Sequence, residues 1–445
     1  MAQVFRAHRY RVHSLSHRRL QERGIDLCSF HSHSVLERRK ARVMGLFKEV
    51  KKPLIRDTKA GGSVSSHRPA YVEKNAPCIA SCTVGNHVRD WMVPLAQHTA
   101  YGRTEDEAFT LAWQAIVERN PFPAISGRVC QHPCELSCNR KAKDAPVAVQ
   151  LLERFVGDFA LSHQLKLTRP AAAQRAGRIA VVGAGPSGLS CAYALVQLGY
   201  SVALFDAASL PGGMMRYRIS RETLPLDILD GEIQNVLDLG IEYHPGCIVG
   251  KDILQENMAR EYRAVIYAIG LQKPAQIQIR QNSGGIPFCG ELPTEAPDIP
   301  SETVELSPRT LNMVTPAIAQ GRRAAEDMDA TLQGKPPAQR VAPPVIKPDR
   351  MKLDWYPALQ RHEASAADGE NAAFGGDLSN EDAIAEAARC MSCGLCMDCE
   401  TCWMYCSSNC FQKLPKGEHY KIRLELCSGC GKCVDACPCG YIQAN

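Results

Sequence analysis

Short apolar runs along the chain predict buried strands. Residues 178–183 (Arg-Ile-Ala-Val-Val-Gly), 201–206 (Ser-Val-Ala-Leu-Phe-Asp) and 264–270 (Ala-Val-Ile-Tyr-Ala-Ile-Gly) each hold at least four consecutive apolar residues, as strands covered on both faces do. Between the first two runs, a glycine-rich turn precedes a stretch that predicts a helix to about Leu198. The order strand, helix, strand is typical of a parallel sheet with helices packed on it.

Residues 104–119 have the periodicity of an amphipathic helix. Four apolar side chains would share one face of it: Phe109, Ala112, Trp113 and Ile116. Thr104, followed three residues later by Glu107, forms a capping box, so we expect the helix to begin there. A shorter acidic and alanine-rich helix is predicted at 381–390, after a stretch at 335–380 that is rich in Pro, Ala and Gly and predicts a linker.

The net charge of +5 conceals an asymmetry. Residues 1–60 hold 15 Lys and Arg against 5 Asp and Glu, a net of +10, so the other 385 residues sum to −5. Such an arm suits an anionic surface, but it has no aromatic interleaving and no nucleic-acid module. We therefore expect a solvated arm, joined by a flexible junction at 61–66, and no nucleic-acid partner.

No apolar run is long enough to predict a membrane span, because the best candidate, residues 179–205, is broken by four glycines. The basic residues 1–60 lack the apolar core of a signal peptide. A cysteine-rich chain without an export signal predicts reduced thiols and a cytoplasmic location.

Twelve of the 21 cysteines lie in the last 56 residues, and eight of them form two matching ladders. The spacing C-x2-C-x2-C-x3-C occurs twice, first in Cys396, Cys399, Cys402 and Cys406, then in Cys427, Cys430, Cys433 and Cys437. This is the spacing of a ferredoxin with two [4Fe–4S] clusters, in which the fourth cysteine of each run ligates the other cluster. The pattern predicts single-electron transfer.

Zinc and disulfides are the alternatives for this region. Zinc sites use C-x2-C pairs separated by a dozen or more residues, and a disulfide framework requires a secreted context. Both fit the ladders less well than iron. Four further cysteines fall outside the ladders and are either extra ligands, part of another site or plain thiols: Cys390, Cys393, Cys410 and Cys439.

A second motif predicts a dinucleotide site. The strand at 178–183 runs into Gly183-Ala184-Gly185-Pro186-Ser187-Gly188, a helix follows, and Asp206 ends the next strand. In this context the glycines permit a tight turn and close approach to a pyrophosphate, while the carboxylate binds ribose hydroxyls. A plain glycine-rich turn is the alternative.

The dinucleotide is NAD(P) or FAD. Gly212 and Gly213, soon after Asp206, and the strand end at Gly270 resemble features of flavoproteins of the glutathione reductase type, and this resemblance favours FAD. The predicted fold class is therefore α/β, a Rossmann-like FAD-binding domain flanked by an N-terminal α-helical Fe–S domain and a C-terminal α+β two-cluster ferredoxin domain. The expected boundaries are 1–65 for the arm, 66–168, 169–334, 335–385 for the linker with its lead-in helix, and 386–445.

In eight short stretches the chain resembles the flavin and iron–sulfur family of the glutamate synthase small subunit. That family includes the flavin half of dihydropyrimidine dehydrogenase and the DsrL-type NAD(P)H:acceptor oxidoreductases that serve dissimilatory sulfite reductase. The matching stretches are 77–82 (Pro-Cys-Ile-Ala-Ser-Cys), 120–123 (Asn-Pro-Phe-Pro), 127–130 (Gly-Arg-Val-Cys), 133–140 (Pro-Cys-Glu-Leu-Ser-Cys-Asn-Arg), 152–155 (Leu-Glu-Arg-Phe), 183–188, 317–322 (Ala-Ile-Ala-Gln-Gly-Arg) and 386–393 (Glu-Ala-Ala-Arg-Cys-Met-Ser-Cys). The Cys437-Pro-Cys-Gly-Tyr ending is most similar to the DsrL type.

The resemblance implies a third [4Fe–4S] cluster near the flavin, bound by residues among five candidates: Cys78, Cys82, Cys130, Cys134 and Cys138. Five candidates exceed four places, so one is spare or a second, partial site exists. Relatives with two clusters here carry an extra cysteine pair just upstream of Cys78, which this sequence lacks. Glu153 aligns with a non-cysteine ligand of some relatives, but we favour the alternative that it is a carboxylate on the helix surface.

The main departure from the family lies between Gly270 and Thr315. Relatives carry an NAD(P)H-binding domain there and then a Gly-Gly-Asp motif at the flavin, whereas about 45 residues separate these two positions here. The segment from Thr315 still has the character of the helix that caps the flavin. The resemblance implies an NAD(P)H:acceptor oxidoreductase with FAD and a partner redox protein such as a sulfite reductase. The alternative is a non-catalytic Fe–S relay on a degenerate flavin fold.

Overall fold

The computed structural model describes residues 67–170, 175–270, 279–281, 287–289, 314–336, 342–363, 378–415 and 418–444. All described residues belong to one compact unit. The predicted basic arm, the junction at 61–66 and the second half of the predicted linker, 364–377, lie outside the described residues.

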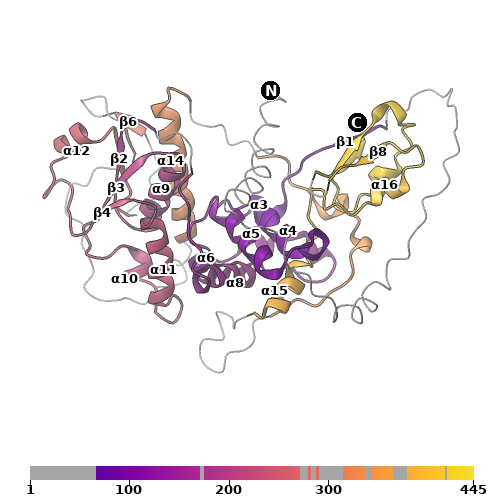
Figure 1. Ribbon diagram of the computed structural model, residues 1–445, viewed down its shortest axis with the longest axis horizontal. Coiled ribbons are helices and arrows are strands. Elements are labelled where there is room, and N and C mark those ends of the chain that lie inside the picture. The colour runs from indigo at the N-terminus through magenta and orange to yellow at the C-terminus, as the bar shows by residue number, and fades with distance from the viewer. Residues whose placement is uncertain are drawn as a thin grey trace, which may run out of the picture. The chain divides into compact units, whose positions relative to one another are not determined.

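A six-stranded sheet forms the middle of the described chain, in the order β4-β3-β2-β5-β7-β6 (Figure 1). The strands are β2 (Arg178–Val182), β3 (Ser201–Phe205), β4 (Glu242–His244), β5 (Ala264–Tyr267), β6 (Ile279–Gln281) and β7 (Pro287–Cys289). All neighbours pair in parallel except β6 with β7. The three strands that the apolar runs predicted are therefore confirmed, as is their parallel pairing.

The helices around this sheet are α9 (Pro186–Gln197), α10 (Met214–Tyr217), α11 (Leu226–Leu237), α12 (Gln255–Glu261) and α14 (Val314–Leu332). Helices α9 and α14 lie side by side, and the Ser190 hydroxyl of α9 donates to the Ile318 carbonyl of α14 at 2.8 Å. Their approach is close because Gly321 presents only hydrogen: a Cβ there would lie 1.9 Å from the Ser187 carbonyl oxygen.

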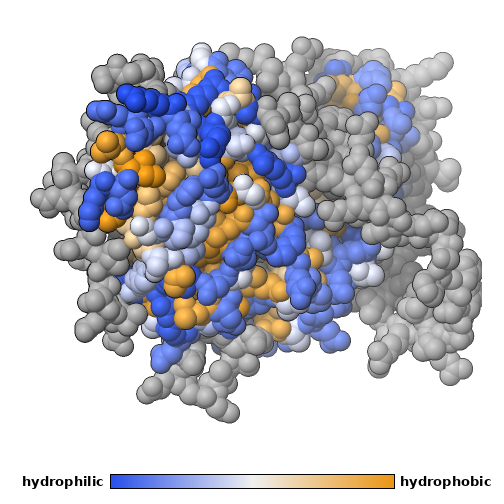
Figure 2. Space-filling view, turned by 60° about the vertical axis from the view of Figure 1, so that its left-hand side comes forward, coloured by the Kyte–Doolittle hydropathy of each residue, from blue (hydrophilic) through white to orange (hydrophobic). Residues whose placement is uncertain are grey.

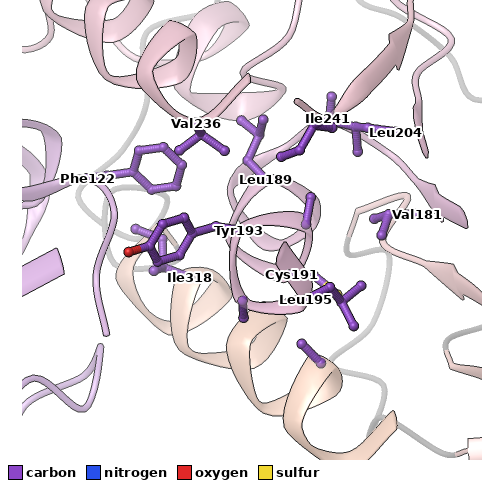
Figure 3. Close-up of a cluster of buried hydrophobic side chains, with 14 of the residues drawn as sticks. Phe122, Val181, Leu189, Cys191, Tyr193, Leu195, Leu204, Val236, Ile241 and Ile318 are labelled. Carbon is purple, nitrogen blue, oxygen red and sulfur yellow. The ribbon is translucent and has the colours of Figure 1, made fainter. Parts of the chain in front are cut away.

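The largest core cluster continues from the sheet into the helical region that precedes it. Phe122 belongs to this cluster together with Tyr193 and Ile318 (Figure 3). The Tyr193 hydroxyl also donates to the Val117 carbonyl at 2.7 Å. This cluster therefore joins the two predicted domains, and the predicted dinucleotide-binding region packs directly against the cysteine-bearing helices.

The helical region holds α3 (Pro77–Ala80), α4 (Val88–Ala96), α5 (Glu105–Val117), α6 (Pro123–Val129), α7 (Pro133–Leu136), α8 (Val149–Ser162) and the 3-10 turns η2 (Thr99–Tyr101) and η3 (Asn139–Ala142). Helix α5 begins after Thr104, whose hydroxyl accepts the Glu107 amide at 3.2 Å while the Glu107 carboxylate accepts the Thr104 amide at 2.9 Å. The predicted capping box and the buried face of this helix are both confirmed.

The C-terminal region is built from β8 (Phe411–Lys413), β9 (Tyr420–Ile422), α16 (Thr401–Tyr405), α17 (Lys432–Ala436), the 3-10 turn η7 (Leu424–Leu426) and β10 (Ile442–Ala444). Strand β10 pairs antiparallel with β1 (Pro69–Tyr71), so the first and last described strands form one ladder. The predicted lead-in helix is α15 (Asn380–Ala387).

Residues 342–363 pack against the fold, although their composition predicted a linker. This segment contains η4 (Pro348–Arg350) and η5 (Leu353–Trp355). Ile346, Met351 and Tyr356 are buried with Met391 in a small core of their own. Prolines fix the backbone without preventing burial, so a proline-rich composition did not exclude packing here.

Apolar patches on the face in Figure 2 are interrupted by hydrophilic side chains. Among the described helices, none combines the length and the apolar character that a membrane crossing requires.

Candidate functional site

The glycine-rich turn after β2 forms a cradle for phosphate. Gly183 has a φ of +105°, and a Cβ there would lie 2.3 Å from the Ala268 carbonyl oxygen. A Cβ on Gly188 would lie 1.7 Å from the Gly183 oxygen. Helix α9 starts at Pro186 with Gly185 as its N-cap. The N–H groups of its first turn have no partner within the helix and are available to a phosphate bound beside the loop. Side chains are thus excluded from a turn that offers backbone N–H donors.

Asp206 supports this turn from the end of β3. Its carboxylate accepts the Ala184 amide and, at 2.7 Å, the Ala208 amide. Burial raises the pKa of Asp206, and the two amides oppose that shift. The sequence predicted a ribose-binding role for Asp206, and the carboxylate that would bind the ribose also braces the loop.

Gly212 and Gly213 lie against the same turn. Gly213 has a φ of +50°, and a Cβ there would come within 2.8 Å of the Gly185 Cα. The Gly212 amide donates to the Ala184 carbonyl at 2.8 Å. Gly270 follows β5, whose carboxyl end lies at the same sheet edge, and has open space where a side chain would stand. These residues fit a dinucleotide: a bare cradle, helix amides and a carboxylate meet at one edge.

Three of the five N-terminal cysteines form a group with Glu153. Burial raises the pKa of Cys134, and neighbouring Cys82, Glu153 and Cys130 raise it further, so the four groups lie close together. Backbone amides point at two of the sulfurs, from Asn86 to Cys82 at 3.2 Å and from His132 to Cys130 at 3.4 Å. Amide donors to sulfur suit thiolates bound to iron. We call this set the Cys82 group.

Glu153 is buried, so the surface alternative for this carboxylate is wrong. It is 8% exposed, accepts the Asn120 amide at 3.2 Å, and burial raises its pKa to about 7. His132 beside the same group is also buried, which lowers its pKa to about 3 and keeps its ring neutral. A buried carboxylate next to three thiols is a reasonable fourth ligand for a cluster.

The Cys82 group touches the start of α14. Thr315 donates from Oγ1 towards the Cys130 Sγ at 3.9 Å, and Thr83 Oγ1 lies 3.7 Å from the same sulfur. The Thr83 hydroxyl donates to the Thr315 hydroxyl at 2.8 Å. Because α14 packs on α9, this contact joins the cysteine group to the dinucleotide fold. Thr83 was missed from the sequence, since its partner lies 232 residues away.

The ladder cysteines fall into two groups in the C-terminal region. Cys396, Cys399, Cys402 and Cys437 line one pocket with Tyr71 and Tyr420. The pKa of Cys433 is raised to about 11 by burial and by three neighbours, which are Cys406, Cys430 and Cys427. Each group therefore combines three cysteines of one ladder with the last cysteine of the other. Both sets fit a four-cysteine cluster by donor type and number.

Two of the four surplus cysteines adjoin these groups. Cys439 Sγ lies 3.8 Å from Cys437 Sγ, and its hydrogen bond lowers the pKa of Cys437 to about 6. Cys410 is buried beside Cys406 and Cys427, and its pKa is raised mainly by burial.

Cys78 and Cys138 are the last two N-terminal candidates, and Cys78 also acts on the Cys134 thiol of the Cys82 group. The neighbours that act most strongly on the Cys78 thiol are Cys393, Cys390 and Cys138. The structure thus divides the five candidates into three and two, and brings the two together with the other surplus cysteines.

Three family models match parts of this chain. Dihydropyrimidine dehydrogenase domain II with its 4Fe-4S cluster matches residues 47–165, an NAD(P)-binding Rossmann-like domain matches 181–249, and a 4Fe-4S binding domain matches 420–442. The chain therefore has an N-terminal iron–sulfur domain, a Rossmann-like NAD(P)-binding domain and a C-terminal ferredoxin domain. The predicted order of an iron–sulfur domain, a Rossmann-like domain and a ferredoxin domain is confirmed.

Curated relatives are oxidoreductase subunits. The beta subunit of the NADP(+)-dependent formate dehydrogenase of Moorella thermoacetica is 32% identical over 239 residues, which are 49% of this chain and 32% of the relative. The NAD-dependent dihydropyrimidine dehydrogenase subunit PreT of Salmonella typhimurium is 33% identical over 165 residues, 37% of this chain and 40% of the relative. The NADPH-Fe(3+) oxidoreductase subunit beta of Geobacter sulfurreducens is 30% identical over 234 residues, 50% of this chain and 33% of the relative.

The chain spans less than half the length of each of these relatives. Among solved structures, Mycobacterium tuberculosis FprA in complex with NADPH matches 24% of this chain and 25% of its own at 22% identity, with a TM-score of 0.21, which is too low to carry an argument.

Proposed function

We propose that this protein is an iron–sulfur flavoprotein that moves electrons between NAD(P)H, FAD and [4Fe–4S] clusters, to or from a partner redox protein. The observation that carries the proposal is the contact between Thr315, at the start of α14, and Cys130 of the Cys82 group. It joins a dinucleotide fold to a set of iron ligands inside one shared core.

The residues divide the work as follows. Gly183, Gly185 and the first turn of α9 would hold a pyrophosphate, and Asp206 would hold the adenosine ribose. FAD, when bound, supplies the exchange between two-electron hydride transfer and single-electron transfer. The Thr315 hydroxyl, which accepts from the Thr83 hydroxyl, would donate towards Cys130 and stabilise it as a thiolate, which is the form that binds iron.

FAD is proposed over NAD(P) as the resident dinucleotide because two features extend the cradle beyond the first loop. The Gly212–Gly213 turn lies against Gly185, and α14 packs along α9 with its first turn at the cysteines. A cofactor bound in this cradle would lie near the cysteines that we propose as cluster ligands. This arrangement suits a resident cofactor that is reduced and reoxidised in place.

The partner that we propose is another redox protein. The C-terminal cysteine groups resemble a ferredoxin, which exchanges electrons with another protein, and the relatives are themselves subunits. By the resemblance of its Cys437-Pro-Cys-Gly-Tyr ending to the DsrL type, a dissimilatory sulfite reductase is the partner we propose.

One observation favours a second candidate function. About 45 residues separate Gly270 from Thr315, too few for a second nucleotide-binding domain. A chain that cannot bind NAD(P)H would act as an Fe–S relay that receives electrons from another subunit.

Anaerobically purified protein tests the proposal by its visible spectrum and by the FAD that it releases on denaturation. We expect flavin bands over a broad iron–sulfur absorbance, and bleaching of the flavin by NADH or NADPH. Iron–sulfur absorbance without extractable FAD would support the relay. Flavin that neither nucleotide bleaches would remove NAD(P)H from the proposal.

Gly185→Ala is the matched variant for the cradle. Its Cβ would lie 4.0 Å from the Gly213 Cα, an ordinary contact, so the fold should tolerate it. The same methyl group would occupy the space through which a pyrophosphate approaches the backbone. We expect reduced FAD content with unchanged iron content. Full FAD occupancy in this variant would show that the dinucleotide binds elsewhere.

A further inference from the structure

We propose that Cys78, Cys138, Cys390 and Cys393 form an additional [4Fe–4S] site, assembled from segments about 250 to 310 residues apart in the sequence. Neither family model of the cysteine regions extends to the second pair of these residues, since one covers 47–165 and the other 420–442. The site would connect the Cys82 group with the ferredoxin-like region. Its existence is independent of the proposed function, whereas its role as a relay rests on it.

The fold brings the four cysteines to one place from both sides. Cys78 lies in α3, and Cys138 is the N-cap of η3, directly after α7, which contacts α3. Cys390 follows α15, a helix that packs on α4 and α8. Cys78, Cys138 and Cys390 all border the core cluster of those helices. All four thiols are free and partly buried.

A buried ionic network fixes the backbone that leads into Cys390. Arg389 is 1% exposed and Glu386 is fully buried, and they pair at 2.6 Å. Arg389 also donates to the Ala145 carbonyl at 2.7 Å and to the Asp144 carboxylate at 3.1 Å. Glu386 accepts the Ala148 amide at 2.7 Å. Charges this deeply buried depend on their partners, so the network favours the docked position of this segment.

Arginines hold the backbone of the docked segment in place. Arg140 donates to the Arg389 carbonyl at 2.8 Å, one residue before Cys390. Arg89, 4% exposed, donates to the Cys393 carbonyl at 3.0 Å and to the Lys74 carbonyl at 3.2 Å. The loop carrying both cysteines is therefore anchored at each end by guanidinium groups from the helical region.

The surroundings suit an anionic cluster. Burial raises the pKa of Cys390 to about 11, and burial followed by neighbouring thiols raises the pKa of Cys393, so free thiolates would be costly here. Arg89 opposes these shifts at Cys78, Cys390 and Cys393. The irons of a bound cluster would offset the negative charge of the thiolates, and the Arg89 guanidinium would stabilise the remaining negative charge of the cluster.

The four sulfurs are not arranged around a single metal ion. Among the residues that the structure describes, one group of three ligand atoms lies within 4.8 Å of one another, in Cys396, Asp398 and His419. No three of the four sulfurs proposed here converge in that way. A single ion needs all its ligands at one point, whereas the four irons of a cubane are ligated at four separate corners.

The site adjoins cysteine groups on either side. The Cys134 thiol of the Cys82 group interacts with Cys78. On the other side, the Gly394 amide donates to the Cys439 carbonyl at 2.8 Å, and the Tyr356 hydroxyl donates to the Met391 carbonyl, between Cys390 and Cys393, at 2.9 Å. The four-cysteine site therefore lies between the flavin-side ligands and the ferredoxin-like ligands.

Iron and acid-labile sulfide counts on the anaerobically purified full-length chain test the proposal. We expect about sixteen irons in the wild-type chain, as four clusters require. The double variant Cys390→Ala/Cys393→Ala should retain about twelve, with its far-UV circular dichroism unchanged. Cys247→Ala is the matched control, because Cys247 is a partly buried thiol outside all four groups and should leave the count unchanged.

Two results would overturn the proposal. One is a fully loaded wild-type chain with about twelve irons, which also decides the case if the double variant fails to fold. The other is a folded double variant with the wild-type iron count. FAD content, measured on the same samples, reports on the proposed function separately, since loss of FAD with about sixteen irons would leave this site intact.

Discussion

Replacing Gly321 by alanine should disrupt the helix pair that carries the dinucleotide loop. The added Cβ would lie 1.9 Å from the Ser187 carbonyl oxygen and 3.0 Å from the Cys191 amide nitrogen. Both atoms belong to the backbone of α9, so no side-chain rotation can relieve the contact. Helices α9 and α14 would have to separate, and Ser187 lies within the glycine-rich loop itself.

The magnitude follows from two opposing effects. Overpacking a core costs about 1 to 3 kcal/mol, and a backbone clash belongs at the upper end. Alanine is favoured over glycine in a helix interior by about 1 kcal/mol. The net loss is about 2 kcal/mol, which corresponds to a fall in Tm of about 4 to 8 °C for a domain of this size.

Gly231→Ala is the control for this experiment. Gly231 also lies in a helix, α11, but its nearest neighbour is the Leu161 Cδ2 at 3.0 Å, the end of a flexible side chain. We expect this variant to unfold at or slightly above the wild-type Tm under anaerobic conditions at one scan rate, because alanine is favoured over glycine in a helix interior. Equal Tm values for Gly321→Ala and Gly231→Ala would refute the close-packed geometry of α9 and α14.

Three further predictions concern buried charges. Asp206→Ala removes the acceptor of the Ala184 and Ala208 amides and should lower the FAD released per chain. Arg389→Met leaves the Glu386 carboxylate buried without its cation, and should destabilise the chain by about 3 to 5 kcal/mol, measured as a fall in Tm. Burial raises the pKa of Glu232 from 4.5 to about 8. Between those pH values the folded state holds one proton more than the unfolded state, so the stability that this proton contributes is lost as pH rises through 8. Glu232→Gln should therefore flatten the dependence of Tm on pH between about 5.5 and 8.5.

The local parts of this fold were predictable from the sequence. Strands β2, β3 and β5 follow from apolar runs, and the start of α5 follows from its capping box, because each depends on residues within a few positions of one another. The regular spacing of the ladders also suggested how their cysteines divide. In such a motif the ligands of one cluster come mostly from one short segment.

The grouping of the N-terminal cysteines could not be predicted from local sequence, because it depends on contacts between distant segments. Arg389 binds Asp144 across 245 residues, and Thr83 binds Thr315 across 232. Neither contact leaves a periodic pattern in the sequence. The burial of Glu153 was likewise invisible, because a carboxylate on an amphipathic helix usually faces solvent.

Rapid-freeze electron paramagnetic resonance after mixing anaerobic protein with NADH or NADPH tests the central claim most directly. If dinucleotide and clusters form one electron-transfer chain, flavin absorbance should bleach and signals of reduced [4Fe–4S] clusters should then grow in. Bleached flavin with every cluster still oxidised would contradict the account.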